Sequence, residues 1–484
     1  MPVAVLRVDA DRKIGAGHLV RCVAIGRALE EEGWTPVLAS TLATADVLPV
    51  PSWRRIVVGE DGSGDDSAVL AAAIPEGVDL LLVDHYGRDA RFERASRPWA
   101  RRILAIDDLS DRRHDCDILV DPTPMRRAAD YDHLVPAGAT RLVGGGYAPL
   151  RAEFARARWR RPVGNASVRS IHLSLGATDP CGHLGAVLDG VAASGFNGKL
   201  VLSLSPLAVG YRDVCARVAA MGGVVLPPDA CMAGSMAACD LAIGAGGVGM
   251  LERACLGLPQ VLVEVAANQR ANLAAVAAAR GGLVVGPPRP ASVAHALRVV
   301  LSDRVLRDSL ARNGAALCDG LGARRVAMEL LDEPCRLRPA TIADSDMLFE
   351  WQREPGTRRY ARDPKPPEPE AHRAWLDARL VDRRCVFLVM EEVGTPRASV
   401  RLDWREEEAG FEVSLVVAPG VRGRGYGVRA LLLARRLVAG EDLLAHVQAA
   451  NEASLRSFSR AGYVSAGQPE WYVNRGGRSS WVSA

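Results

Sequence analysis

His18 is the side chain of this sequence with the clearest potential for catalysis. It ends the segment Gly15-Ala16-Gly17-His18, which follows an apolar run at residues 3–8 and opens a helix predicted to end near Gly33. The positive end of the helix dipole disfavours an imidazolium ion, so a histidine in the first turn is expected to be neutral. A neutral imidazole is suited to act as a general base near pH 7. His18 can instead serve only as a cap, but the flanking glycines let a ligand approach the backbone and favour catalysis.

Polar residues also follow the other apolar runs in the first half of the chain. Asp9 follows the run at 3–8, and the runs at 78–83, 102–106 and 118–120 are followed by Asp84-His85-Tyr86, Asp107-Asp108 and Asp121. Ligands of open parallel sheets bind at the carboxyl ends of the strands. A single aspartate there is often only a helix cap. Several such clusters on one predicted edge indicate a site.

A second set of glycine turns and polar residues lies between residues 170 and 270. The strand predicted at 240–244 leads into Gly244-Ala245-Gly246-Gly247 and then a helix that carries Glu252. This order predicts a diphosphate cradle, with Glu252 placed to accept hydrogen bonds from ribose hydroxyls. A further glycine turn, Gly176-Ala177-Thr178-Asp179-Pro180, follows the strand at 170–175, and Asn268-Gln269 follow the strand at 260–265. Tight strand–helix packing explains the glycines but not Glu252 together with Asn268-Gln269.

The last third of the chain contains another glycine loop, Arg422-Gly423-Arg424-Gly425-Tyr426-Gly427. It follows an alternating strand at 411–417 and precedes an apolar helix at 428–438. Successive backbone N–H groups and a helix N-terminus suit a pyrophosphate. Alone, such a loop is equally typical of a surface hairpin. A strand at 443–448 followed by Asn451 makes the hairpin interpretation weaker.

The elements that position these residues divide into three groups. Two successive sets of alternating strands and helices predict two Rossmann-like parallel sheets covered by helices, at residues 1–158 and 159–333. Near Pro334 the pattern changes to longer alternating strands, which predicts a mixed α/β domain at residues 336–484. The fold class is therefore α/β, with two Rossmann-like domains followed by a mixed domain.

Length and composition are those of a globular protein of two or three domains. Of 484 residues, 49% are hydrophobic and 24% charged, and 60 Lys+Arg stand against 57 Asp+Glu, so no nucleic-acid partner is expected. Neither a leader nor an apolar run long enough for a bilayer is recognised, and no membrane partner is expected. The ten cysteines are scattered, as in a reduced, cytoplasmic protein. The oligomeric state stays open.

The first two thirds of the chain resemble the pseudaminic-acid pathway hydrolases that cleave UDP from UDP-2,4-diacetamido-2,4,6-trideoxy-β-L-altropyranose. The motifs that carry this resemblance are Asp9-Ala10, Ile14-Gly15-Ala16-Gly17-His18-Leu19-Val20-Arg21-Cys22, Val83-Asp84-His85-Tyr86-Gly87, Ile106-Asp107-Asp108-Leu109, His114-Asp115-Cys116-Asp117, Gly244-Ala245-Gly246-Gly247, Glu252-Arg253, Leu256-Gly257-Leu258-Pro259 and Asn268-Gln269. The resemblance implies a GT-B-like architecture with the nucleotide held by the second domain. It also implies metal-independent attack of water at the anomeric carbon, with His18 as the base and Tyr86 in the site. Asp84 is a further candidate catalytic residue.

One position departs from that family. Relatives usually carry hydroxyl residues after the double glycine, where this chain has Val248-Gly249. Two contacts to phosphate oxygens are then missing, at about 1 kcal/mol each. Backbone N–H groups are the expected replacement.

Residues from Leu337 to Ala484 resemble the GNAT acetyltransferase superfamily, whose R/Q-x-x-G-x-G/A loop is matched by Arg422 to Gly427. The resemblance implies acetyl-CoA as co-substrate, held by that loop and by Asn451. Glu412 is the candidate base, and an exposed strand carboxylate is an equally good interpretation. Phe458 stands where many relatives have a tyrosine acid, so water, the acceptor amine or Tyr463 must protonate the thiolate. Trp351-Gln352-Arg353 and Arg358-Arg359 resemble the acceptor-side segment of sugar-amine acetyltransferases.

Together, the two resemblances predict a bifunctional enzyme that acetylates a UDP-4-amino sugar and then hydrolyses the UDP-diacetamido sugar. A GT-B glycosyltransferase that uses a UDP-amino sugar is the alternative enzyme, and a non-catalytic nucleotide-sugar sensor is the alternative outside catalysis. Asp84, His85, Asp107 and Asp108 have the chemistry of metal ligands, but their spacing matches no strong metal pattern. We therefore expect no metal.

Overall fold

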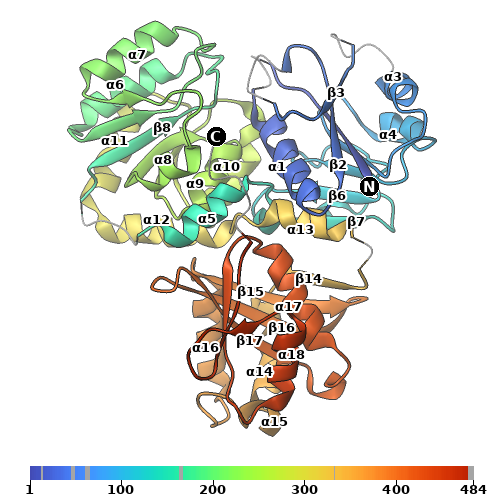
Figure 1. Ribbon diagram of the computed structural model, residues 1–484. Helices are drawn as coiled ribbons and strands as arrows, with labels where there is room; N and C mark the ends of the chain where they lie inside the picture. The colour runs from blue at the N-terminus through green and yellow to red at the C-terminus, as the bar shows by residue number, and fades with distance from the viewer. Residues whose placement is uncertain (12–14, 45–49, 60–65, 163–166, 332, 478–484) are drawn as a thin grey trace. The chain divides into compact units, whose positions relative to one another are not determined.

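The computed structural model describes residues 1–11, 15–44, 50–59, 66–162, 167–331 and 333–477 (Figure 1). Ile14, which belongs to one of the motifs above, and the last residues of the chain lie outside these ranges. The chain divides into two compact units, Met1–Ala327 and Met328–Ala484. Within the described ranges, every helix is too short or too polar to span a bilayer.

The first lobe of unit 1 is built on a seven-stranded parallel sheet, drawn from blue to cyan in Figure 1. Its spatial order is β3-β2-β1-β4-β5-β6-β7, so the order reverses between β1 and β4. The strands are β1 (Val3–Val8), β2 (Thr35–Ser40), β3 (Arg54–Val57), β4 (Leu80–Asp84), β5 (Ile103–Ile106), β6 (Ile118–Asp121) and β7 (Thr140–Val143). Helices α1 (Gly17–Glu31), α3 (Asp66–Ala73) and α4 (Ala90–Ser96) belong to this lobe. The central strands are buried on both faces, which is why they read as continuous apolar runs.

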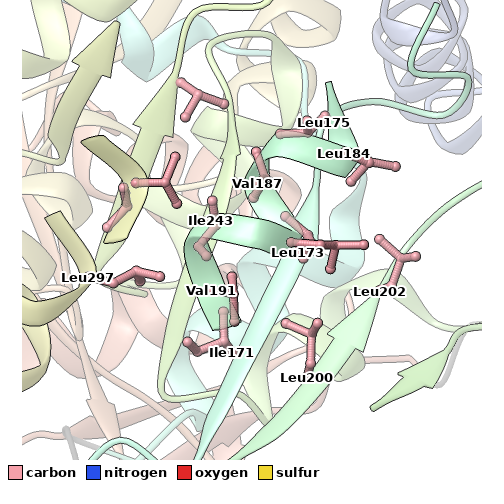
Figure 2. Packing of buried hydrophobic residues seen from close by; sticks show 14 of the residues in the cluster. Ile171, Leu173, Leu175, Leu184, Val187, Val191, Leu200, Leu202, Ile243 and Leu297 are labelled. Atoms are coloured by element: carbon pink, nitrogen blue, oxygen red, sulfur yellow. The ribbon is translucent and has the colours of Figure 1, made fainter. Parts of the chain in front are cut away.

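The second lobe repeats this plan with a six-stranded parallel sheet in the order β10-β9-β8-β11-β12-β13. Its strands are β8 (Ser170–Ser174), β9 (Lys199–Leu202), β10 (Val224–Val225), β11 (Leu241–Ala245), β12 (Gln260–Val263) and β13 (Leu283–Gly286). The helices are α6 (Leu184–Ser194), α7 (Tyr211–Ala220), α8 (Met232–Ala237), α9 (Val248–Cys255), α10 (Arg270–Ala278), α11 (Pro290–Ser302) and α12 (Arg304–Leu317). Figure 2 shows apolar side chains of β8, β9 and β11 packing against α6 and α11, among them Leu173, Val187 and Leu297.

Two helices tie the lobes of unit 1 together. Helix α5 (Ala152–Arg160), which contains the predicted boundary at 158/159, packs on α8 and α9 of the second lobe. Its Arg158 donates to three carbonyls of that lobe, those of Cys255, Ala315 and Cys318. Helix α13 (Gly322–Glu329) returns to the first lobe, where Arg325 donates to the Gly146 carbonyl at 2.7 Å. The two sheets are therefore held as one unit.

Unit 2 contains a mixed seven-stranded sheet in the order β14-β15-β16-β17-β18-β20-β19. The strands are β14 (Cys335–Pro339), β15 (Cys385–Glu392), β16 (Thr395–Arg405), β17 (Gly410–Val417), β18 (Asp442–His446), β19 (Val464–Ser465) and β20 (Trp471–Asn474). The helices are α14 (Ser345–Arg353), α15 (Pro355–Arg358), α16 (Pro369–Leu380), α17 (Tyr426–Leu437) and α18 (Glu452–Arg460). The predicted fold class, two parallel-sheet α/β domains followed by a mixed α/β domain, is confirmed.

A buried histidine in the first lobe links stability to pH. His114 Nδ1 lies 2.7 Å from Glu93 Oε1, and its Nε2 lies 3.7 Å from Asp107 Oδ2. Burial alone would lower the pKa of His114, but the carboxylates of Asp107 and Glu93 raise it to about 9. The imidazolium form therefore stabilises the folded lobe.

We expect the contribution of His114 to be complete below pH 6.5 and to disappear as the pH rises through about 9. A shift of this size corresponds to about 3 kcal/mol. Urea unfolding of the wild type and of His114→Gln at a series of pH values measures it. The difference in unfolding free energy should shrink between neutral pH and pH 9.5, and a constant difference would contradict the assignment.

Candidate functional site

A cleft of about 690 Å³ in unit 1 is lined by residues of both lobes. In each lobe, part of this lining follows the strands at which the sheet order reverses, which are β1 and β4 in the first lobe and β8 and β11 in the second. The loops after such neighbouring strands diverge to opposite faces of the sheet and leave a crevice between them. The cleft thus joins the two crevices.

The first lobe places His18 on the wall of the cleft, with Asp84 behind it. His18 is the second residue of α1, and Asp84 is the last residue of β4. Strand β1, which precedes α1, is adjacent and parallel to β4, and its last residue, Val8, is paired with Asp84. His18 Nδ1 therefore lies 2.7 Å from Asp84 Oδ1. An Nδ1–H donated to this carboxylate leaves Nε2 with a lone pair as the basic nitrogen.

Arg21 completes the arrangement, and it was not among the predicted site residues. Its Nε and Nη2 donate to the two oxygens of Asp84 at 2.6 and 2.7 Å, and Nη1 donates to Asp108 at 2.8 Å. Burial alone would raise the pKa of Asp84, but the charge of Arg21 and the hydrogen bonds from Arg21 and His18 outweigh it and hold that pKa well below the usual range. Asp84 is thus an anion that orients the imidazole. The available signal was the spacing, since Arg21 lies three residues after His18 on one helix face.

Tyr86 connects the lobes across the cleft. Its ring meets that of His18 edge to face, with centroids 4.8 Å apart. The Tyr86 hydroxyl donates to Asp108 Oδ1 at 3.1 Å and accepts from Asn268 Nδ2 of the second lobe at 3.3 Å. Burial, and then the charge of Asp108, raise the pKa of Tyr86, so the phenol stays protonated.

Asp107 takes a different place from its neighbour Asp108. It is fully buried and is not part of the cleft wall. Its carboxylate accepts from the N–H groups of Leu109 and Ser110 and from the Tyr131 hydroxyl, and it pairs with Arg112 at 2.8 Å. Asp107 therefore stabilises the loop after β5. Among the described residues, no group of three or more His, Cys, Asp or Glu side chains is arranged to hold a metal ion.

The second lobe contributes most of its predicted residues to the cleft. Those on the wall are Gly176, Gly247, Glu252, Asn268 and Gln269, opposite Gly15 and Gly17 of the first lobe. Gly246 lies behind the wall, where its N–H donates to Gln269 Oε1 at 3.0 Å. Glu252 Oε1 accepts from Arg151 at 3.1 Å, and Arg151 also lines the cleft. Val248 packs toward the first lobe, with Cγ2 3.4 Å from the position of a Cβ on Gly17.

In unit 2 the glycine loop between β17 and α17 has the geometry of an anion cradle. Gly423 and Gly425 have φ of +80° and +84°, and a Cβ built on either glycine meets nothing within 4 Å. The space above the loop is therefore open, and α17 begins directly after it at Tyr426. This loop fits a pyrophosphate on backbone N–H groups.

Strands β17 and β18 part next to that loop. They pair in parallel at three positions, the last of which joins Glu412 to Leu444. Beyond Glu412, β17 continues to Val417 while β18 ends at His446. The backbone groups of β17 that face β18 are thus released from the sheet, which leaves room for a chain-like ligand between the strands.

Several residues predicted to bind acetyl-CoA have partners within unit 2. Arg422 donates to Thr357 Oγ1 and pairs with Glu354 at 2.8 Å, so it fastens the loop to α15. The Tyr426 hydroxyl donates to Glu392 at 2.5 Å. Asn451 caps α18, where its Oδ1 accepts from the Ser454 N–H at 3.2 Å.

In unit 2 the candidate base, Glu412, is paired with arginines, and the candidate acid, Tyr463, is buried. Glu412 is 9% exposed and contacts Arg362 at 2.5 Å and Arg405 at 3.5 Å. Phe458 and Tyr463 are both buried and meet edge to face at 4.9 Å. Burial raises the pKa of Tyr463, and its hydroxyl has no hydrogen-bond partner among the described residues. Tyr463 is therefore enclosed in the core.

Comparisons with known proteins agree with this division. A UDP-2,4-diacetamido-2,4,6-trideoxy-beta-L-altropyranose hydrolase from Campylobacter jejuni is 29% identical over 151 residues, 31% of this chain and 52% of the relative. The chain thus spans about half the length of the curated relative that it matches. Residues 335–464 match the model of the Acetyltransferase (GNAT) domain. The predicted fusion is confirmed: the N-terminal part resembles that hydrolase, and a GNAT domain follows it.

Solved structures are similar to separate parts of the chain. MurG from Acinetobacter baumannii has a TM-score of 0.49 at 14% identity, covering 68% of this chain and 99% of MurG. An aminoglycoside acetyltransferase in complex with coenzyme A has a TM-score of 0.26 at 16% identity, covering 29% and 94%. The spermidine N-acetyltransferase from Vibrio cholerae in complex with CoA and spermine has a TM-score of 0.26 at 15% identity, covering 29% and 92%.

Proposed function

We propose that this chain is a bifunctional nucleotide-sugar enzyme of pseudaminic (nonulosonic) acid biosynthesis. Unit 1 hydrolyses a UDP-2,4-diacetamido-2,4,6-trideoxyhexose to the free sugar and UDP. Unit 2 transfers an acetyl group from acetyl-CoA to the 4-amine of the precursor. The observation that carries the proposal is the His18–Asp84 pair, oriented by Arg21, on the wall of a two-lobed cleft.

The hydrolysis assigns a role to each side chain of this group. Water forms a bond to the anomeric carbon, and the bond from that carbon to the UDP oxygen breaks. His18 Nε2 takes a proton from the attacking water, and Asp84 stabilises the imidazolium that results. The UDP leaves as an anion held by the second lobe, where Gly247 and the start of α9 meet the diphosphate. Glu252 accepts hydrogen bonds from the ribose hydroxyls.

The acetyl transfer uses the loop and the strand split of unit 2. Arg422 to Gly427 hold the pyrophosphate of acetyl-CoA, which supplies the acetyl group. The amine nitrogen forms a bond to the thioester carbonyl carbon, and the carbon–sulfur bond breaks. Glu412 takes the amine proton, directly or through a water molecule, after releasing Arg362. The thiolate receives a proton from water, because Phe458 cannot donate one and Tyr463 is enclosed.

Liquid chromatography of products from the UDP-4-amino sugar tests both activities at once. With acetyl-CoA we expect an acetylated nucleotide sugar followed by free UDP, and without acetyl-CoA we expect neither. If neither product appears with acetyl-CoA present, the proposal fails. UDP release that requires an added acceptor alcohol would instead identify a glycosyltransferase.

Asp84→Asn tests how the imidazole is oriented. An asparagine side chain keeps the shape of Asp84 but presents no carboxylate to Nδ1–H, and it removes one of the two carboxylates that pair with Arg21. We expect the rate of UDP release to fall by about tenfold to 100-fold, at the low end of general acid–base effects. Initial rates with the UDP-diacetamido sugar measure this fall. An unchanged rate would remove Asp84 from the mechanism.

A further inference from the structure

The side chain of a buried arginine on α9 lies against the glycine turn of the second lobe. The hydrolysis described above does not use this arginine. Arg253 is 1% exposed, yet it belongs to the wall of the cleft. Its guanidinium packs directly against Gly244. A Cβ built on Gly244 would fall 2.4 Å from both Cζ and Nη1 of Arg253. A Cβ on Gly249 would lie 3.2 Å from Nη1. The turn from Gly244 to Gly249 therefore wraps around the guanidinium.

The hydrogen bonds of Arg253 go to neutral groups. Its Nε donates to Gln260 Oε1 at 3.0 Å, and Nη2 donates to the Ala245 carbonyl at 2.7 Å. Among the described residues, Arg253 forms no ion pair. Burial lowers its pKa to about 10, although the charge of the adjacent Glu252 acts in the opposite direction. A buried cation without a partner is unfavourable, so a bound anion would complete this site.

The start of α9 adds a second source of positive potential at the same turn. The first N–H groups of a helix have no partner within it, and this end attracts anions. Side-chain hydroxyls are absent here, since Val248 packs toward Gly17 and residue 249 is glycine. The guanidinium of Arg253 lies next to Gly249, one of the two positions where a side-chain hydroxyl is missing.

We propose that Arg253 is the specificity-determining residue by which this cleft prefers a nucleoside diphosphate to an uncharged nucleoside. The inference depends on the proposed function of the cleft as a UDP-sugar site. Arg253 acts through its buried positive charge, and its bond to the Ala245 carbonyl holds the turn that presents the N–H groups. Binding of the diphosphate adds to the partial counter-charge that Glu252 supplies.

Isothermal titration calorimetry of the full chain with uridine, UMP and UDP distinguishes an effect of the Arg253 charge on binding from an effect of Arg253 on the fold. In the wild type, affinity should rise from uridine to UDP. In Arg253→Met we expect the ratio of UDP to uridine affinity to fall about tenfold to 100-fold, the size of a lost charge interaction. Uridine affinity should be unchanged, and Arg253→Lys should recover part of the ratio. An unchanged ratio in Arg253→Met would overturn the inference.

Arg158→Met is the matched control. Arg158 is also buried and bonded to carbonyl groups, but it does not line the cleft. This variant should lose stability while it keeps the ratio of affinities. A ratio that falls equally in both variants would show that only the fold of the lobe matters, and would overturn the inference.

The wild type provides a measurement that does not depend on the folding of any variant. Salt screens a buried charge much less than exposed charges. The preference for UDP over uridine should therefore persist at about 0.5 M NaCl. Its disappearance there would assign the preference to exposed cations and contradict the role of Arg253. A wild type that binds neither ligand would instead refute the proposed function of the cleft.

Discussion

His18→Ala is expected to abolish most of the UDP release while leaving UDP bound as tightly as before. His18 is the only catalytic base that we assign to the hydrolysis, and removing a general base typically lowers a rate by about 10²–10⁴-fold. The residues proposed to hold the diphosphate and the ribose, Gly247 and Glu252, belong to the second lobe, so the substitution leaves them in place. Initial rates with the UDP-diacetamido sugar, and titration with UDP, measure the two effects.

His295→Ala serves as the control for this substitution, because His295 is exposed on α11 and does not line the cleft. It should retain the wild-type rate. Undiminished UDP release by His18→Ala would contradict the role of the imidazole. A wild type that binds UDP but never releases it from the sugar nucleotide would indicate a sensor instead.

Gly425→Val is expected to remove acetyl transfer and to leave hydrolysis intact. Gly425 has φ of +84°, a conformation that strains a β-branched residue by about 1–3 kcal/mol. The valine side chain would also project into the open space above the loop. We expect the affinity for acetyl-CoA to fall by more than about 100-fold, as measured by titration with acetyl-CoA.

Gly420→Ala is the control for the loop, since Gly420 also has open space at its Cβ position but has no positive φ. Acetyl-CoA affinity should be retained there. Hydrolysis of the already acetylated sugar nucleotide should proceed at the wild-type rate in both variants. Normal acetyl-CoA binding by Gly425→Val would show that the loop does not hold the co-substrate.

Sequence patterns located the central strands of unit 1 because parallel strands that are buried on both faces read as apolar runs. The strand predicted at 118–120 is seen at Ile118–Asp121, and the one at 240–244 at Leu241–Ala245. Strand β2 escaped prediction, because Pro36 lies inside it and proline argues against a strand. Strand β3 is a short edge strand that begins with Arg54-Arg55 and gave no apolar run.

The residues of the candidate site were predictable where each followed its own strand. His18 and Asp84 are brought together by the pairing of β1 with β4. Asp107 and Asp108 looked equivalent, but one carboxylate is directed into the lobe and the other reaches Arg21 and Tyr86. Contacts made only by packing, such as those of Arg21 with Asp84 or Arg362 with Glu412, leave no local signature.

Hydrolysis in ¹⁸O-labelled water tests most directly the claim that unit 1 directs water onto the anomeric carbon. The wild type would be incubated with the UDP-diacetamido sugar, and the molecular mass of the released UDP would be measured by mass spectrometry. We predict that UDP is released and carries no ¹⁸O, because the bond that breaks joins the anomeric carbon to oxygen. Release of ¹⁸O-labelled UDP would place the attack on phosphorus and contradict this account, as would the absence of any UDP.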